Sequence, residues 1–169
     1  MTNLKHIVII SLLALASLPA TMASPRDVNL VRNADCEKMA GAAAAYWAPY
    51  GNGYEMVNEG RGSGWGIKCQ NNTEDNKYFG ACQTIVFDPP VQPPFILLSG
   101  WSRAINAKGD YGTDYCVYLD VHYHKDGPCD SESNKALHLW GLRTSFKYGT
   151  HDWEKSEKVF RFSPCINYR

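Results

Sequence analysis

The fold is decided by the stretch FILLSGWSRAINAKGDYGTDYCVYLDVHYH, which runs from Phe95 to His124. Two strand-like runs flank a linker, residues 105–113, that contains two glycines. In the second run, apolar residues alternate with polar or aromatic ones in the order Val117, Tyr118, Leu119, Asp120, Val121 and His122. Because successive side chains of a β-strand point to opposite faces, this pattern predicts one apolar face and one aromatic and polar face. A ligand surface is expected on the second face.

Short strand-like runs with glycine and proline turns between them recur in the rest of the chain. They cover residues 28–37, 54–58, 67–70, 79–87, 137–146 and 152–162. Residues 88–94, DPPVQPP, read as a connection, because proline cannot donate a hydrogen bond to a sheet. Residues 38–46, KMAGAAAAY, could form a short helical turn, although Gly41 weakens that prediction. The pattern predicts one all-β domain, a sandwich or barrel of about eight antiparallel strands.

The first 23 residues have the composition of a signal peptide. Lys5 and His6 precede an apolar run, residues 7–18, and small residues follow at positions 20–24, so cleavage is expected after Ala23. The apolar run is shorter than the roughly 20 residues that a membrane-spanning helix needs, and an uncleaved anchor is the alternative. The expected mature chain is therefore a secreted domain, residues 24–169, without a membrane span.

The charge balance argues against nucleic acid as a partner. The chain has 17 Lys and Arg residues and 17 Asp and Glu residues, and no run of like charges stands out. Surfaces that bind nucleic acid need clustered basic residues to contact phosphates. Neutral partners such as sugars fit this balance, although the balance does not select them.

Six cysteines and one sequon fit an extracellular chain. An even number of cysteines behind a signal peptide predicts disulfides, and a zinc site is the alternative that the lack of a Cys-x-x-Cys pair disfavours. Cys69 and Cys82 lie on either side of the polar loop NNTEDNKY, so a hairpin would place them opposite each other as a disulfide. Asn71 begins the glycosylation sequon Asn-Asn-Thr, which is expected on an exposed loop.

Motifs spread over residues 28–162 follow one another in a recognisable order. They are NLVRNADCE, GSGWGIKC, GACQTIVF and LLSGWSRA, followed by DYCVYLDVHYHKDG, LWG and GTHDWEK. In this order they resemble the β-jelly-roll carbohydrate-binding modules of the galactose-binding-like superfamily. The resemblance implies a jelly-roll sandwich that binds a polysaccharide or other glycan on a concave sheet face, without catalysis.

The end of the chain departs from that family pattern. Such modules usually continue to an Asp-Asp-Val-like strand that helps the opening strand to hold a structural calcium, whereas this sequence ends in Cys-Ile-Asn-Tyr-Arg. Asp35 and Glu37 match the opening half of the calcium site, and its closing half has no match. No other cofactor is expected. The missing strand would also leave an open sheet edge, which predicts self-association.

A sugar site needs flat aromatic side chains for the CH faces of the sugar and planar polar groups for its hydroxyls. Neighbouring predicted strands offer such residues, namely Trp101, Arg103, Tyr118, Asp120, His122 and Trp140. Antiparallel pairing of the two runs in residues 95–124 would place the first two of these beside the next three. Trp140 and Arg143 have opposite parity, so they share a face only if a bulge intervenes, which Gly141 permits.

Other interpretations of the same residues stay open. Arg103 could form a cross-strand ion pair with Asp120, and the tryptophans could belong to the core. A metal site would use Asp120, His122 and His124, with His138 as a third histidine. A polysaccharide lyase would use Arg103, Tyr118 and His122. The main alternative to glycan binding is a structural protein of an extracellular matrix or cell wall, with the same fold and no defined pocket.

Overall fold

The chain is all-β in the computed structural model, which describes residues 11–14, 28–62, 64–71, 78–86, 95–109, 112, 114–122 and 138–161. No helix occurs in these segments, so the all-β prediction is confirmed there, and nothing in them could cross a membrane as a helix. The strands are β1 (Ser11–Ala14), β2 (Val28–Asn29), β3 (Met39–Ala40), β4 (Ala43–Ala44), β5 (Ala48–Gly51), β6 (Glu55–Val57), β7 (Gly66–Lys68), β8 (Phe79–Cys82), β9 (Phe95–Ala107), β10 (Cys116–His122), β11 (His138–Ser145) and β12 (Gly149–Arg161).

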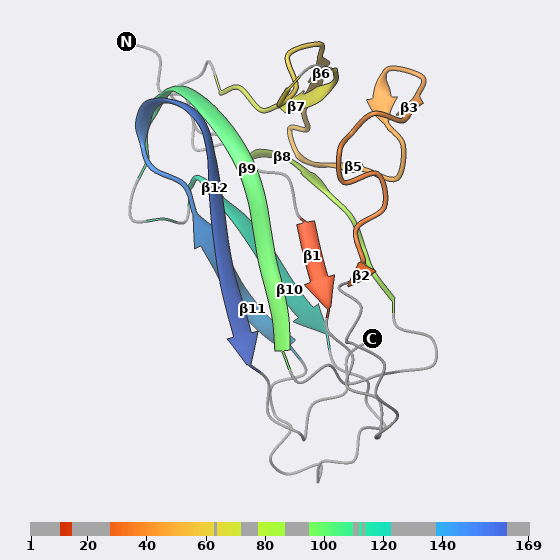
Figure 1. Cartoon of the computed structure of the whole chain (residues 1–169), viewed down its shortest axis with the longest axis vertical. Helices are drawn as coiled ribbons and strands as arrows, with labels where there is room; N and C mark the ends of the chain where they lie inside the picture. Colours follow the sequence, from red (N-terminus) through yellow and green to blue (C-terminus); the bar gives the residue numbers. More distant parts are fainter. Residues whose placement is uncertain are drawn as a thin grey trace, which may run out of the picture.

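The largest sheet is built around β9, the first of the two runs in residues 95–124. Its strand order is β12-β9-β1-β2, and neighbouring strands are antiparallel. β9 pairs with β12 from Phe95 opposite Arg161 to Ala107 opposite Gly149, with register shifts around His151. β10 and β11 pair with each other and cross behind β9 and β12 as a second layer (Figure 1). Two layers of antiparallel strands are consistent with the predicted β-sandwich.

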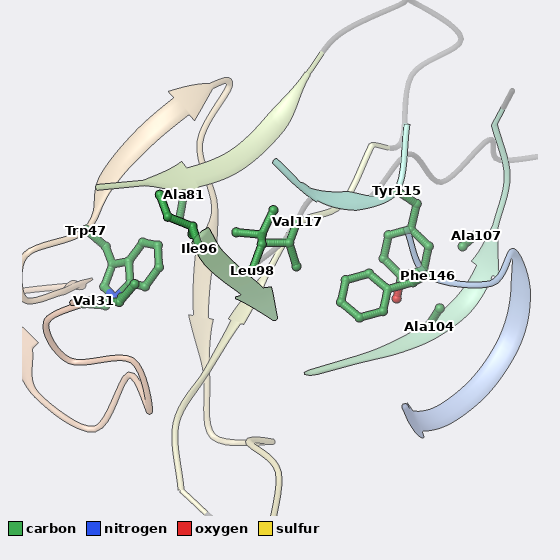
Figure 2. Close-up of a cluster of buried hydrophobic side chains, with 11 residues drawn as sticks. Val31, Trp47, Ala81, Ile96, Leu98, Ala104, Ala107, Tyr115, Val117 and Phe146 are labelled. Carbon is green, nitrogen blue, oxygen red and sulfur yellow. The ribbon is translucent and has the colours of Figure 1, made fainter. Parts of the chain in front are cut away.

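The core lies between these two layers and extends under the N-terminal hairpins. On β9, Ile96, Leu98 and Ala104 are buried while Trp101 is exposed, which is the alternation of a strand with one face on a core. Leu98 and Val117 are both 0% exposed, and burying a side chain of this size stabilises the fold by about 1.5–3 kcal/mol. The buried cluster, drawn in Figure 2, comprises Val31, Ala44, Trp47, Ala81, Ile96, Leu98, Ala104, Ala107, Tyr115, Val117 and Phe146.

Tyr115 joins the two layers at one end of the core. It directly precedes β10, its hydroxyl is hydrogen-bonded to that of Ser102 on β9, and its ring centroid lies 5.1 Å from that of Phe146, which follows β11. The ring of His151 on β12 lies 6.0 Å away. Burial raises the pKa of the Tyr115 phenol to about 12, so the hydroxyl stays protonated at neutral pH. One side chain next to β10 therefore contacts residues on or next to three other strands.

The alanine-rich segment forms a hairpin, so the prediction of a helical turn there is wrong. β3 and β4 pair around Gly41, whose φ is +65°. The Asn33 side chain accepts a hydrogen bond from the Lys38 N–H and donates to the carbonyls of Lys38 and Ala45. Trp47 is 5% exposed, and its indole N–H donates to the Asn33 carbonyl. In a helical turn, backbone N–H and C=O groups bond to each other. Here the Asn33 side chain instead bonds to backbone groups of Lys38 and Ala45.

β1 lies inside the segment that is predicted to be a signal peptide. It pairs with β9 over Ile96 to Ser99 and with β2 on its other side. Strand pairing in the full-length chain does not test processing, so cleavage after Ala23 stays a prediction. Removal of the leader would take β1 out of the sheet and open this edge of β9.

The strands next to Cys69 and Cys82 do not pair with each other, as the hairpin suggested by the sequence would require. β7, which precedes Cys69, pairs with β6, whereas β8, which ends at Cys82, pairs with β5. Because their strands have different partners, the two cysteines are not opposite each other, and no disulfide joins them. Asn71 is 1% exposed rather than on an exposed loop, so a glycan on its amide would have to displace the residues packed around it.

Two buried thiols predict a loss of stability at alkaline pH. Burial, with the carboxylates of Asp35 and Glu37, raises the pKa of Cys36 to about 12, and burial raises the pKa of Cys116 to about 11. In the unfolded chain both thiols ionise near their usual pKa of 9.0. Each therefore contributes stability that is complete below that pH and is lost as the pH rises through the folded-state pKa. In the presence of a reductant, the urea midpoint should fall between about pH 9 and about pH 12.

The control for this pH dependence is Cys36→Ala, which removes one of the two titrating thiols. The variant should be less stable than the parent at neutral pH, because it leaves a small cavity, but its urea midpoint should fall less steeply with pH. Identical slopes for parent and variant would contradict the assignment of the alkaline loss to Cys36.

Candidate functional site

A bulge between β10 and β11 shapes the outer face of the smaller sheet. Leu119 lies opposite Leu142 and Val121 lies opposite Leu139, so two residues of β11, Trp140 and Gly141, face the single intervening residue of β10. Gly141 has a φ of +78°, a left-handed conformation that glycine adopts without strain. The bulge that this glycine permits is therefore present.

The bulge brings Trp140 and Arg143 onto one face with the polar residues of β10. Arg143 lies opposite Tyr118 in the register. The Trp140 ring stands edge-on to the ring of His122, with centroids 5.4 Å apart and planes at 83°. We call this surface the β10–β11 face, and it consists of Tyr118, Asp120, His122, Trp140 and Arg143. It contains four of the six residues that the sequence suggested for a sugar site.

Hydrogen bonds fix the polar groups of the β10–β11 face in place. The Asp120 carboxylate accepts a hydrogen bond of 3.2 Å from the backbone N–H of Gly141, inside the bulge. Partial burial and the hydrogen bond to Asp120 raise the pKa of the Tyr118 phenol. The Arg143 guanidinium has five N–H groups and donates one of them to the Gly141 carbonyl at 3.3 Å. The face therefore presents both acceptors and donors in fixed positions, while Trp140 is 61% exposed.

Trp101 and Arg103 lie on the other sheet, so the prediction that they neighbour the β10 residues is wrong. β9 pairs with β12 and β1 and never with β10. The Arg61 guanidinium lies 4.0 Å from the centroid of the Trp101 ring and covers part of it. Arg103 forms an ion pair of 2.6 Å with Glu59, so the alternative of an Arg103–Asp120 pair is also wrong. Both side chains are engaged by the glycine-rich segment that precedes β7.

The carboxylates suggested for calcium each accept a hydrogen bond from a backbone N–H group. The Glu37 carboxylate accepts a hydrogen bond of 3.2 Å from the Trp65 backbone N–H, and the Asp35 carboxylate accepts one from the Glu37 N–H. No group of three or more His, Cys, Asp or Glu residues that could hold a metal occurs among the described positions. The calcium site therefore stays a prediction. Of the proposed histidine ligands, His124 lies outside the described residues, as does the side chain of His138.

A cleft between β11 and β12 adds residues that the sequence interpretation missed. It has a volume of about 460 Å³ and is lined by Gly141, Leu142, Arg143, Thr144, Ser145, Lys158 and Phe160. Lys158 and Phe160 are two positions apart on β12 and therefore point to the same side of the strand. In residues 156–160 Lys158 shares its parity with Phe160 but not with Val159, so alternation along the strand did not mark this lysine as part of a cleft.

Comparison of the chain with protein-family models, curated proteins and solved structures gives no match. The geometry of the β10–β11 face and of the adjoining cleft is therefore what any functional assignment must be built on. In that geometry an exposed indole, a fixed carboxylate, a phenol, an imidazole and a guanidinium share one sheet face.

Proposed function

We propose that this chain is a secreted, non-catalytic glycan-binding module that uses the β10–β11 face. The observation that carries the proposal is the bulge at Gly141, which places exposed Trp140 next to His122 and in line with Asp120 and Arg143. An indole offers a flat apolar surface to the CH face of a sugar ring. Planar carboxylate and guanidinium groups can each form paired hydrogen bonds with neighbouring hydroxyls.

Contacts within the protein hold the bottom of the proposed site before a ligand arrives. The Asp120 carboxylate accepts a hydrogen bond from the Gly141 N–H, and the Trp140 ring stands edge-on to the His122 ring. A binding site whose groups already have the bound geometry loses less conformational entropy when a ligand binds. This supports recognition of an oligosaccharide by a surface that does not need to rearrange.

Catalysis by a lyase mechanism is disfavoured by the separation of its candidate residues. Arg103 lies on β9 and is paired with Glu59, whereas Tyr118 and His122 lie on β10 in the other layer. The trio therefore cannot meet around one uronate ring. Together with the two-layer, all-β architecture, the motif order in residues 28–162 supports the finer proposal of a jelly-roll carbohydrate-binding module.

The test is Trp140→Ala, measured by affinity gel electrophoresis on a panel of soluble polysaccharides. Loss of the stacking surface should weaken binding to the best polysaccharide by about tenfold or more, which corresponds to about 1.4 kcal/mol. The matched control is Trp101→Ala, which removes an exposed tryptophan from the other sheet and should change affinity by less than about twofold.

Two outcomes would contradict the proposal. One is that the parent protein is not retarded by any polysaccharide of the panel. The other is that Trp101→Ala weakens binding as much as Trp140→Ala does, since the site would then not lie on the β10–β11 face. Circular dichroism of both variants, compared with the parent, separates a loss of binding from a loss of folding.

A further inference from the structure

The cleft between β11 and β12 exists because two consecutive strands belong to different layers. The two strands are bridged where the Ser156 hydroxyl on β12 donates to the Ser145 carbonyl and lies 2.7 Å from the Thr144 hydroxyl. Beyond this bridge, β12 continues with Lys158 and Phe160 on the same side as Ser156, and these two residues line the cleft opposite β11. The cleft of about 460 Å³ thus opens where the layers are no longer bridged. That size is within the usual range of pockets for small ligands.

Among the described residues that line the cleft, two are positively charged and none is negatively charged. Several other basic side chains of the described strands form ion pairs, as in Lys68–Glu55, Arg103–Glu59 and Lys155–Glu157. Neither Lys158 nor Arg143 makes an ion pair with any residue that the structure describes. Two cations that face one cleft and lack an acidic partner repel each other, and a bound anion would remove that repulsion.

Both cations are positioned by contacts that leave hydrogen-bond donors for a ligand. The Lys158 ammonium lies 5.3 Å from the centroid of the Phe160 ring, a cation–π contact that keeps it over the wall of the cleft. Within the part of the chain that the structure describes, the Arg143 guanidinium donates a hydrogen bond only to the Gly141 carbonyl. A guanidinium binds carboxylate or sulfate oxygens through two parallel hydrogen bonds, and an ammonium adds a point charge. Leu142 and Phe160 provide apolar walls for the body of a sugar ring.

From this geometry we infer that the cleft binds the acidic group of a charged glycan, a uronate carboxylate or a sulfate ester. The inference rests on the proposed function, because Arg143 belongs both to the β10–β11 face and to the cleft lining. A sugar stacked on the face and an acidic neighbour seated in the cleft would be consecutive units of one chain. The ligand is then an acidic polysaccharide rather than a neutral one.

The test compares Lys158→Gln with Lys155→Gln on three soluble polymers. Lys155 lies on the same strand as Lys158 but points to the other side of the sheet. There it is opposite Trp101 and forms an ion pair with Glu157. The polymers are a polyuronate, a sulfated dextran and unmodified dextran, each titrated at low and moderate salt. Lys158→Gln should weaken binding to one acidic polymer by about tenfold, leave binding to the neutral polymer unchanged, and reduce the salt dependence. Lys155→Gln should match the parent.

The outcomes separate the inference from the function on which it rests. If neutral polymers bind as well as acidic ones and Lys158→Gln has no effect, the cleft inference is overturned while the glycan proposal stands. If none of these or other polysaccharides binds, both are overturned. If Lys158→Gln and Lys155→Gln lost the same affinity for the acidic polymer, the loss would reflect the overall surface charge. That result would also overturn the inference. The polymer that loses affinity, uronate or sulfate, identifies the acidic group.

Discussion

Replacing Tyr115 with alanine is expected to destabilise the fold by about 3–5 kcal/mol, enough to unfold a large fraction of a domain of ordinary stability. The side chain is 1% exposed, and its ring packs on Phe146 while its hydroxyl bonds Ser102 in the opposite layer. Alanine would leave a ring-sized cavity where the two layers meet. Urea unfolding monitored by circular dichroism measures the loss.

Tyr115→Phe is the matched control, since it keeps the ring and removes only the hydroxyl. It leaves the Ser102 hydroxyl without this partner and should cost about 0.5–1.5 kcal/mol. If alanine proved no more destabilising than phenylalanine, the ring would not hold the layers together. The role assigned to Tyr115 would then be wrong.

Replacing Gly141 with valine should abolish most glycan binding and destabilise the smaller sheet. A β-branched residue at a φ of +78° is strained, at a cost of about 1–3 kcal/mol, and the strain would be relieved by loss of the bulge. Without the bulge, Trp140 and Arg143 would point to opposite faces again. Binding to the best polysaccharide should therefore weaken by about tenfold or more.

Gly141→Asn separates backbone strain from steric blocking. A Cβ at this position would meet nothing closer than the Arg143 guanidinium at 3.6 Å, an ordinary contact, so space is not limiting. Asparagine tolerates the left-handed conformation better than valine and should keep most of the affinity. Equal loss of binding in the asparagine and valine variants would show that the bulge geometry is not what the site requires.

Local patterns predicted the faces of the strands well. Alternation in residues 117–122 predicted the two sides of β10, and Gly141 permitted the bulge that unites Trp140 with Arg143 without predicting it. Each of these features depends on side-chain direction or backbone conformation within one strand or one pair. Side-chain direction and local backbone conformation depend on a few adjacent residues, so the sequence indicates them directly.

Which strands pair with each other could not be predicted from the sequence. The runs on either side of residues 105–113 look like a hairpin, yet β9 pairs with β12 and β1, and β10 pairs with β11. As a result Trp101 is covered by Arg61 instead of neighbouring Tyr118. The pairing of strands depends on how much apolar surface the two packed layers bury together, and a short stretch of sequence does not reveal that quantity. The same limit explains why Cys69 and Cys82 looked adjacent.

The pairing of β9 with β12 also sets the order in which this protein can fold during synthesis. Leu98 pairs with Lys158, and Ala48 pairs with Cys82, so the main contacts join residues far apart along the chain. Folds dominated by such contacts typically form in milliseconds to seconds, because distant segments must meet first. A ribosome must therefore finish residue 161 before β9 can complete its ladder with β12. Until then this edge of β9 is unpaired, and unpaired strand edges are prone to aggregation.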